Sequence, residues 1–380
     1  MEILEINDLK KLCRKKVPKM FYDYVDSGSW SEATYKANEE DFSKIKLRQR
    51  VGIDIQKRSL STEILGKKYD LPIGFSPTGM AGMLFPNAEI IAAKICKDNN
   101  IPYTLSTMSI CSIEQVAEKT NNYPFWFQLY VMKDKEFVKN IILRAKKANC
   151  GALVLTMDLP VLGQRHNDIR NGLSTPPKLN LKHILQLLQR PIWCFRMLST
   201  KNKTFGNIHG HAKGAENMSS IIKWTNNQFD QKISWDYIKW IRKLWDGPLI
   251  LKGILDEKDA IIAKDFDIDA IIVSNHGGRQ LDGTISSIFA LRRIVDKVGN
   301  DIELYFDGGI RSGQDALKAL SIGAKAVFIG RPYLYGLGGL GREGAQKVID
   351  IMRKEIDITL ALCGENDIKN LNSKNLYEDI

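Results

Sequence analysis

Short apolar runs, rich in leucine, isoleucine, valine and phenylalanine, recur along this 380-residue chain. Runs of this kind, without a polar residue at every second position, are typical of strands buried on both faces of a parallel sheet. We therefore expect eight parallel strands, at residues 71–75, 103–105, 125–129, 153–156, 249–251, 270–273, 303–306 and 326–329.

Amphipathic patterns with helical spacing lie between these runs, at 89–99, 112–119, 134–148, 234–244, 257–264, 286–298 and 313–322. Ser112, Asp134, Ser234 and Asp256 stand where N-caps are expected. Strands that alternate with helices predict a parallel α/β fold, and eight such units predict closure into a (β/α)₈ TIM barrel.

The chain reads as a single domain, 1–380, with three parts. Residues 1–70 are expected to form an N-terminal helical cap, with helices at 9–16 and 18–26, and residues 71–365 the barrel. A long insertion, 160–233, separates the fourth strand from the fifth. In a barrel such an excursion lies over the catalytic face, which predicts a lid or a docking element.

Composition indicates the kind of partner and the cellular compartment to expect. The net charge of +11 favours an anionic partner, such as an acidic membrane surface, a nucleic acid or an anionic small molecule. The six cysteines are scattered, so we expect reduced thiols. Without a signal-peptide pattern or a run of eighteen apolar residues, a cytoplasmic protein is expected.

Polar residues follow each predicted strand, and active sites of such barrels lie at the carboxyl ends of the strands. These ends contain Ser76-Pro77-Thr78-Gly79, Ser106-Thr107, Gln128-Leu129-Tyr130, Thr156-Met157-Asp158, Lys252-Gly253, 274–279, Asp307-Gly308-Gly309 and Gly330-Arg331. Ordinary turns would also be polar, but eight polar strand ends on the same side of one barrel predict an active site.

The last two strand ends predict a phosphate site. Gly308 and Gly309 allow the backbone to approach an anion, Arg311 follows, and Gly330-Arg331 repeats the arrangement on the next strand. Lys252 ends an apolar run, which indicates either a Schiff-base nucleophile or a cation beside an anionic cofactor ring.

His276 lies in a glycine-flanked turn, three residues before Arg279. A base beside a guanidinium suits proton abstraction from a substrate that carries a carboxylate. Two other motifs are set aside. The G-x-G-x-x-G match at 336–341 lacks a following βαβ unit, so we expect a flexible loop. His209 and His211 have no third ligand nearby, so no metal site is expected.

Several of these motifs are shared with one family. Phe21-Tyr22-Asp23-Tyr24, Trp126-Phe127-Gln128-Leu129-Tyr130, 274–280 and 307–311 carry the likeness. From about residue 5 to residue 365, the chain resembles the FMN-dependent α-hydroxy-acid oxidases and dehydrogenases.

The resemblance implies FMN as cofactor and assigns roles to matching positions. His276 would be the catalytic base, oriented by Asp158, and Tyr130 would bind the substrate hydroxyl or carbonyl oxygen. Tyr24, Arg165 and Arg279 would bind a small 2-hydroxy carboxylate. The implied FMN contacts are Pro77, Thr78, Gly79, Ser106, Gln128, Thr156, Lys252 and Ser274, with Asp307, Gly308, Gly309, Arg311, Gly330 and Arg331 at the phosphate. Both a hydride and a carbanion route would need this base.

Within the family, 235–237, 245–248 and 252–256 resemble the bacterial L-lactate dehydrogenases. Met108 replaces the aromatic residue of glycolate oxidase-like members. The resemblance thus implies oxidation of L-lactate to pyruvate, with electrons passed to a quinone or cytochrome of the respiratory chain. One alternative is an oxidase for lactate, glycolate or mandelate that uses oxygen. Another is a non-redox flavin barrel whose basic surface binds nucleic acid, against which Tyr24, Tyr130, His276 and Arg279 argue.

The insertion has its own signal, because residues 169–215 contain no Asp or Glu and several basic residues, including Lys178 and Lys213. Leu181, Ile184, Leu185 and Leu188 recur at helical spacing, followed by Trp193 and Phe195. This pattern favours peripheral association with the inner face of an anionic membrane. A helix packed on the barrel or on a subunit neighbour would give the same pattern. The family resemblance also implies a homotetramer.

Overall fold

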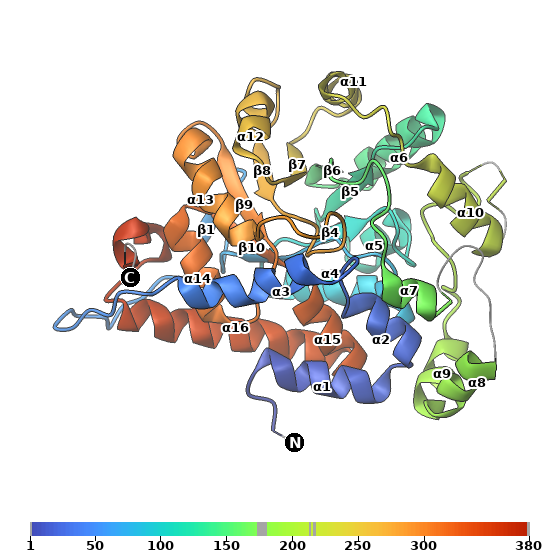
Figure 1. The fold of residues 1–380 in the computed structure, drawn as a ribbon, viewed down its shortest axis with the longest axis horizontal. Coiled ribbons are helices and arrows are strands. Elements are labelled where there is room, and N and C mark those ends of the chain that lie inside the picture. Colours follow the sequence, from blue (N-terminus) through green and yellow to red (C-terminus); the bar gives the residue numbers. More distant parts are fainter. Residues whose placement is uncertain (1, 173–180, 213, 216–217, 378–380) are drawn as a thin grey trace.

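Eight parallel strands form one barrel in the computed structural model, which describes residues 2–172, 181–212, 214–215 and 218–377 (Figure 1). The strands are β3 (Ile73–Phe75), β4 (Thr104–Ser106), β5 (Trp126–Tyr130), β6 (Ala152–Thr156), β7 (Leu249–Ile254), β8 (Ala270–Val273), β9 (Glu303–Asp307) and β10 (Ala326–Ile329). Their order is β3-β10-β9-β8-β7-β6-β5-β4, and a parallel bridge between Phe75 and Tyr103 joins the ends. The predicted barrel and all eight strand positions are confirmed.

Side chains on alternate strand positions divide the core into two parts. Trp126, Tyr305 and Phe328 belong to a cluster that fills the barrel, and the Trp126 ring centroid lies 5.2 Å from that of Phe328. Their neighbours, such as Phe127 and Phe306, belong to the larger core shared with the surrounding helices. Both faces of the strands are buried, which explains the continuous apolar runs from which the strands were predicted.

Helices flank the strands at the predicted positions: α4 (Ala88–Asp98), α5 (Ile113–Lys119), α6 (Lys135–Lys147), α11 (Trp235–Leu244), α12 (Glu257–Lys264), α13 (Ser287–Val298) and α14 (Gly313–Ile322). The side chains of Ser112, Asp134 and Asp256 accept capping hydrogen bonds from backbone N–H groups. Ser234 stands at the N-cap position of α11, but its side chain makes no capping bond.

The sequence suggested a helical cap for residues 1–70, but the structure also contains a β-hairpin there. This part contains α1 (Ile6–Lys16), α2 (Lys19–Val25), α3 (Ala33–Glu40) and the 3₁₀ turn η1 (Asp41–Lys44), and then an antiparallel hairpin of β1 (Thr62–Ile64) and β2 (Lys67–Tyr69). Leu65 and Gly66 both have positive φ, at 51° and 71°, as a two-residue hairpin turn requires. This hairpin was not predicted from the sequence.

The glycine-rich stretch 336–341 is not a flexible loop. Most of it lies in α15 (Arg331–Leu340), which precedes the long α16 (Arg342–Leu362). A side chain at Gly338 would meet the Cys13 sulfur of α1, and one at Gly336 would meet the backbone at Gly344 of α16. The glycines therefore allow three helices to pack closely, and this packing overrides their low helix propensity. The remaining short turns are η2 (Ala81–Met83), η3 (Ile368–Asn370) and η4 (Ser373–Asn375).

The insertion contains α7 (His166–Arg170), α8 (Leu181–Leu188), α9 (Pro191–Ser199) and α10 (Met218–Gln228). α8 and α9 lie side by side at one edge of the molecule (Figure 1). Trp193, which the sequence pattern favoured as part of the membrane-facing segment, instead stacks its ring on Phe21 and donates its N–H to the Met83 carbonyl. Lys178 and Lys213 fall outside the described residues. In the described part of the chain, no helix is long and apolar enough to cross a membrane.

Candidate active site

A cavity of about 760 Å³ opens at the carboxyl ends of the strands. Of the residues predicted for the site, all but three line it. The three exceptions each contact a lining residue: Asp158 contacts His276, Ser106 contacts Gln128, and Ser274 contacts Lys252. The structure therefore brings the whole predicted set together.

His276 lies in the turn after β8 in a left-handed conformation, with φ of 59°, and its N–H donates to the Ser274 hydroxyl. Its ring Nδ1 lies 2.8 Å from Asp158 Oδ1, and both side chains are largely buried. Gly253 makes room for this carboxylate, because a Cβ there would lie 2.5 Å from Asp158 Cγ. A carboxylate that accepts from Nδ1 leaves Nε2 as the proton acceptor.

Arg279 lines the cavity next to Tyr24. Its guanidinium stacks over the Tyr24 ring, 4.7 Å from the centroid, and Nη1 donates to the Tyr24 carbonyl. Burial, and then the nearby Arg165 cation, lower the Arg279 pKa from its usual value. Arg279 Nη2 is buried and has no hydrogen-bond partner among the described residues. A free donor on a buried cation is suited to an anionic ligand.

Asp168, on α7, was not singled out from the sequence. Its Oδ2 lies 3.8 Å from Arg165 Nη1 and 4.0 Å from Arg279 Nη2, so one carboxylate faces both guanidinium groups. Burial raises the Asp168 pKa even though both arginines oppose this. The Arg165-x-x-Asp168 spacing on a helical turn was the available signal, but the second arginine is distant in sequence.

Tyr130 ends β5 and its ring packs edge-on against Phe229, with 5.7 Å between centroids. Burial raises the Tyr130 pKa above its usual value, so its hydroxyl stays protonated and can donate a hydrogen bond. Behind it, Gln128 donates to the Thr156 hydroxyl and accepts from Ser106, at 3.0 and 3.1 Å. This chain of neutral polar groups fixes the orientation of the Gln128 amide.

Lys252 is buried beside Asp307, with 3.4 Å between Nζ and Oδ1, and donates to the Ser274 hydroxyl at 2.8 Å. Asp307 also accepts from Ser274 and Ser76. Burial opposes ionisation of Asp307, yet Lys252 and the two hydroxyls keep its pKa below the usual value. The lysine is thus a paired cation that faces the cavity, which disfavours the Schiff-base reading because a free amine is needed for it.

Glycines after β9 and the start of α15 form the predicted anion corner. Gly308 and Gly309 have φ of 124° and 82°, and a Cβ on Gly309 would overlap the Asn38 carbonyl. Gly330 is the N-cap of α15, so the first N–H groups of that helix face the same corner. Arg311 pairs with Glu39 at 2.7 Å, and its buried Nε has no partner in the part of the chain that is described.

These groups fit FMN. The cavity volume is in the range of cofactor sites, which is about 300–1,000 Å³. The glycine backbone, the α15 N-terminus and the free Arg311 Nε would hold a phosphate. Lys252, Gln128 and Thr156 would hold the polar edge of the ring system.

Comparisons with known proteins agree with this geometry. The sequence is 41% identical to the L-lactate dehydrogenase of Vibrio cholerae over 379 residues, and each chain is covered completely. It is 40% identical to the L-lactate dehydrogenase of Haemophilus influenzae, with 100% and 99% of the two chains covered.

Solved structures show the same fold. The crystal structure of the monotopic membrane protein (S)-mandelate dehydrogenase matches with a TM-score of 0.95 at 33% identity, and both chains are covered completely. Mandelate oxidase with (S)-4-hydroxymandelic acid matches with a TM-score of 0.85 at 30% identity, over 99% and 98% of the chains. The profile of the FMN-dependent dehydrogenases matches residues 13–378, and the chain belongs to this FMN-dependent family.

Proposed function

We propose that this enzyme oxidises L-lactate to pyruvate. The observation that carries the proposal is the position of the His276–Asp158 pair in the same cavity as Arg279, Arg165 and Tyr130. A base, two carboxylate-binding cations and a hydroxyl donor are what a 2-hydroxy acid requires. The full-length identity of about 40% to L-lactate dehydrogenases supports lactate among such acids.

In the proposed mechanism, Arg279 and Arg165 bind the substrate carboxylate, and the hydroxyls of Tyr24 and Tyr130 orient the substrate in the same cavity. His276 Nε2 takes the hydroxyl proton as the carbonyl forms. Asp158 keeps the Nδ1–H tautomer in place and stabilises the imidazolium that results. FMN held in this cavity would supply the oxidant, because it can accept the hydrogen of the substrate α-carbon together with two electrons as a hydride equivalent. The Lys252 ammonium lines the cavity, and it would offset negative charge on reduced FMN.

We further propose that the electrons pass to a quinone or cytochrome rather than to oxygen, and that the enzyme works at an anionic membrane. α8 and α9 support the second point, because they expose six large apolar side chains to solvent: Ile184, Leu185, Leu188, Ile192, Phe195 and Leu198. Phe195 is 77% exposed. Arg196, Lys201 and Lys203 are exposed on the same segment. Apolar patches rimmed by basic residues suit the interface of an anionic bilayer.

The structural neighbour described as a monotopic membrane protein supports this placement. A homotetramer is also proposed, on the family resemblance alone, and light scattering after size-exclusion chromatography tests it.

The decisive experiment is anaerobic mixing of purified holoenzyme with L-lactate or D-lactate. We expect the flavin absorbance to bleach with L-lactate and stay unchanged with D-lactate. Rapid bleaching by L-mandelate or glycolate, with none by L-lactate, would overturn the substrate assignment. Turnover that is as fast with oxygen as with a quinone analogue would make the enzyme an oxidase.

A further inference from the structure

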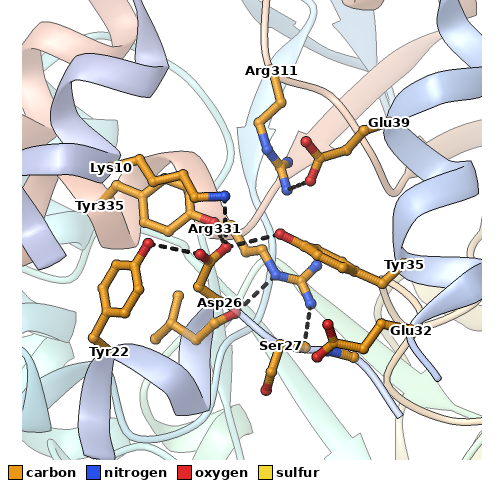
Figure 2. Close-up of polar contacts among 12 residues, drawn as sticks. Lys10, Tyr22, Asp26, Ser27, Glu32, Tyr35, Glu39, Arg311, Arg331 and Tyr335 are labelled. Atoms are coloured by element: carbon orange, nitrogen blue, oxygen red, sulfur yellow. Dashed lines mark hydrogen bonds and ion pairs between the residues drawn. The ribbon is translucent and has the colours of Figure 1, made fainter. Parts of the chain in front are cut away.

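Asp26, directly after α2, is the centre of a largely buried polar cluster that the proposed mechanism does not use. Figure 2 shows three tyrosine hydroxyls and one ammonium directed at its carboxylate. Tyr22 donates to Oδ2 at 2.7 Å, while Tyr35 and Tyr335 donate to Oδ1 at 2.8 and 2.6 Å. Lys10 Nζ lies 3.0 Å from Oδ1. These four partners come from α2, α3, α15 and α1, so one carboxylate ties four helices together.

The carboxylate is ionised in the folded protein. Burial by itself would raise its pKa, but the hydroxyls of Tyr335 and Tyr22 and the Lys10 ammonium lower it to about 2. Charge-assisted hydrogen bonds are stronger than neutral ones, and here a buried anion accepts several of them. The backbone on either side of Asp26 is therefore firmly held.

That backbone in turn holds Arg331. The carbonyls of Val25 and Ser27 accept from Arg331 Nε and Nη2, at 2.8 and 2.9 Å, and the Gly277 carbonyl accepts from Nη1 at 3.0 Å. The guanidinium also stacks on the Tyr35 ring, 4.6 Å from its centroid. Arg331 is the first residue of α15, so these contacts fix the helix start that faces the anion corner (Figure 2).

The same segment holds the turn that carries the catalytic base. Arg279 Nη1 donates to the carbonyls of Tyr24 and Ser27, and the Ser29 N–H donates to the Gly278 carbonyl at 2.9 Å. The segment 24–29 therefore contacts both the phosphate corner and the turn 276–280.

We propose that Asp26 is a positioning residue: it holds the segment 24–29 so that Arg331, the start of α15 and Arg279 are in place for FMN and substrate. Asp26 itself does not line the cavity. Its role toward FMN depends only on family membership, whereas its role toward substrate also rests on the proposed function.

The proposal is testable because charge alone and positioning predict opposite changes in FMN binding when Asp26 is replaced. The positive charges of Arg311, Arg331 and Lys10 are partly offset by the negative charges of Asp26 and Glu39 (Figure 2). Loss of the Asp26 charge would make the corner more positive and would strengthen phosphate binding if charge alone decided. If Asp26 acts by positioning, its loss instead weakens FMN binding.

The test is titration of apoprotein with FMN in the wild type and in Asp26→Asn. The quenching of flavin fluorescence measures binding. We expect the dissociation constant to rise at least tenfold. Asp357→Asn is the matched control. It removes a carboxylate that makes two hydrogen bonds with Arg58, away from the cavity, and should leave the dissociation constant within twofold of wild type.

Tyr335→Phe is a milder second variant, because it removes one donor and keeps the carboxylate. It should weaken FMN binding in the same direction by a smaller factor, even if Asp26→Asn does not fold. Unchanged or tighter FMN binding in a folded Asp26→Asn, or in Tyr335→Phe if the first variant does not fold, would overturn the proposal. Since no substrate is present, this result is independent of whether lactate is the substrate.

Discussion

His276 and Asp158 are arranged so that only one imidazole nitrogen can serve as a base. Nδ1 lies 2.8 Å from Asp158 Oδ1, which accepts its proton in a hydrogen bond, and Nε2 remains for the substrate. Asp158 lies just after β6 and His276 just after β8, so the barrel itself brings the two residues together. Asp158 Oδ2 has no partner within the described residues, which leaves the carboxylate dedicated to this contact.

His276→Gln should retain FMN and lose turnover by about 10²–10⁴-fold, the usual contribution of a general base. Glutamine can accept a hydrogen bond but cannot take up a proton at neutral pH. The rate of anaerobic flavin bleaching by L-lactate measures the effect, and the flavin-to-protein absorbance ratio serves as the control. A variant that keeps more than about a tenth of wild-type turnover would remove His276 from this role.

Gly253→Ala should disturb the pair without touching either residue. The added Cβ would lie 2.5 Å from Asp158 Cγ, and the φ of 95° is strained for alanine. We expect kcat to fall at least tenfold, because the base loses its orientation. The change in KM should be smaller, because the arginines that bind the substrate carboxylate are not affected. Gly66→Ala is a suitable control, since its φ is also positive and it lies in the β1–β2 turn with open space around it. Equal losses in both variants would point to backbone strain alone.

Asp168→Asn should change which anions the site prefers. Arg165 and Arg279 with Asp168 carry a net charge of about +1, which matches a monocarboxylate. Without the Asp168 charge, the dianion oxalate should gain more affinity than the monoanion pyruvate, at least tenfold more if the groups interact at an effective dielectric of about 20. Inhibition constants for both compounds measure this. A parallel shift for the two would show that Asp168 acts on the shape of the site instead.

Asp26 should make the fold sensitive to acid. Its pKa is lowered from 3.8 to about 2 in the folded protein, so its contribution is fully present above pH 3.8 and is lost as the pH falls toward 2. That shift corresponds to about 2 kcal/mol of unfolding free energy. Urea denaturation between pH 5 and 2 should show a shallower loss of stability in Asp26→Asn than in wild type. Parallel curves would mean that other carboxylates control acid unfolding.

The strands and the residues at their ends were predictable because burial on both faces imposes continuous apolar runs, and a barrel brings all strand ends to one side. The G-x-G-x-x-G helix was not, since its glycines serve contacts with Cys13 and Gly344 that only the folded chain creates. Asp168 and Asp26 escaped notice for the same reason. Each owes its role to partners that are distant in sequence, such as Arg279 and Tyr335.

The exposed face of α8 and α9 gives the last prediction. Leu188, Phe195 and Leu198 are 70%, 77% and 72% exposed, and burial of such side chains in a bilayer would contribute about 1.5–3 kcal/mol each. Replacement of all three by serine should abolish sedimentation with anionic vesicles and reduce turnover with a membrane quinone. Turnover with a soluble acceptor should not change, because none of the three lines the cavity.

Serine at Leu143 and Leu362, which are exposed on α6 and at the end of α16, is the matched control and should leave vesicle binding intact. If the triple variant still sediments, the membrane contact lies elsewhere on the surface. If the wild type never binds vesicles at physiological salt, the face instead contacts a subunit neighbour or closes over the site. In that case the same three substitutions should alter the oligomeric state or the KM for lactate.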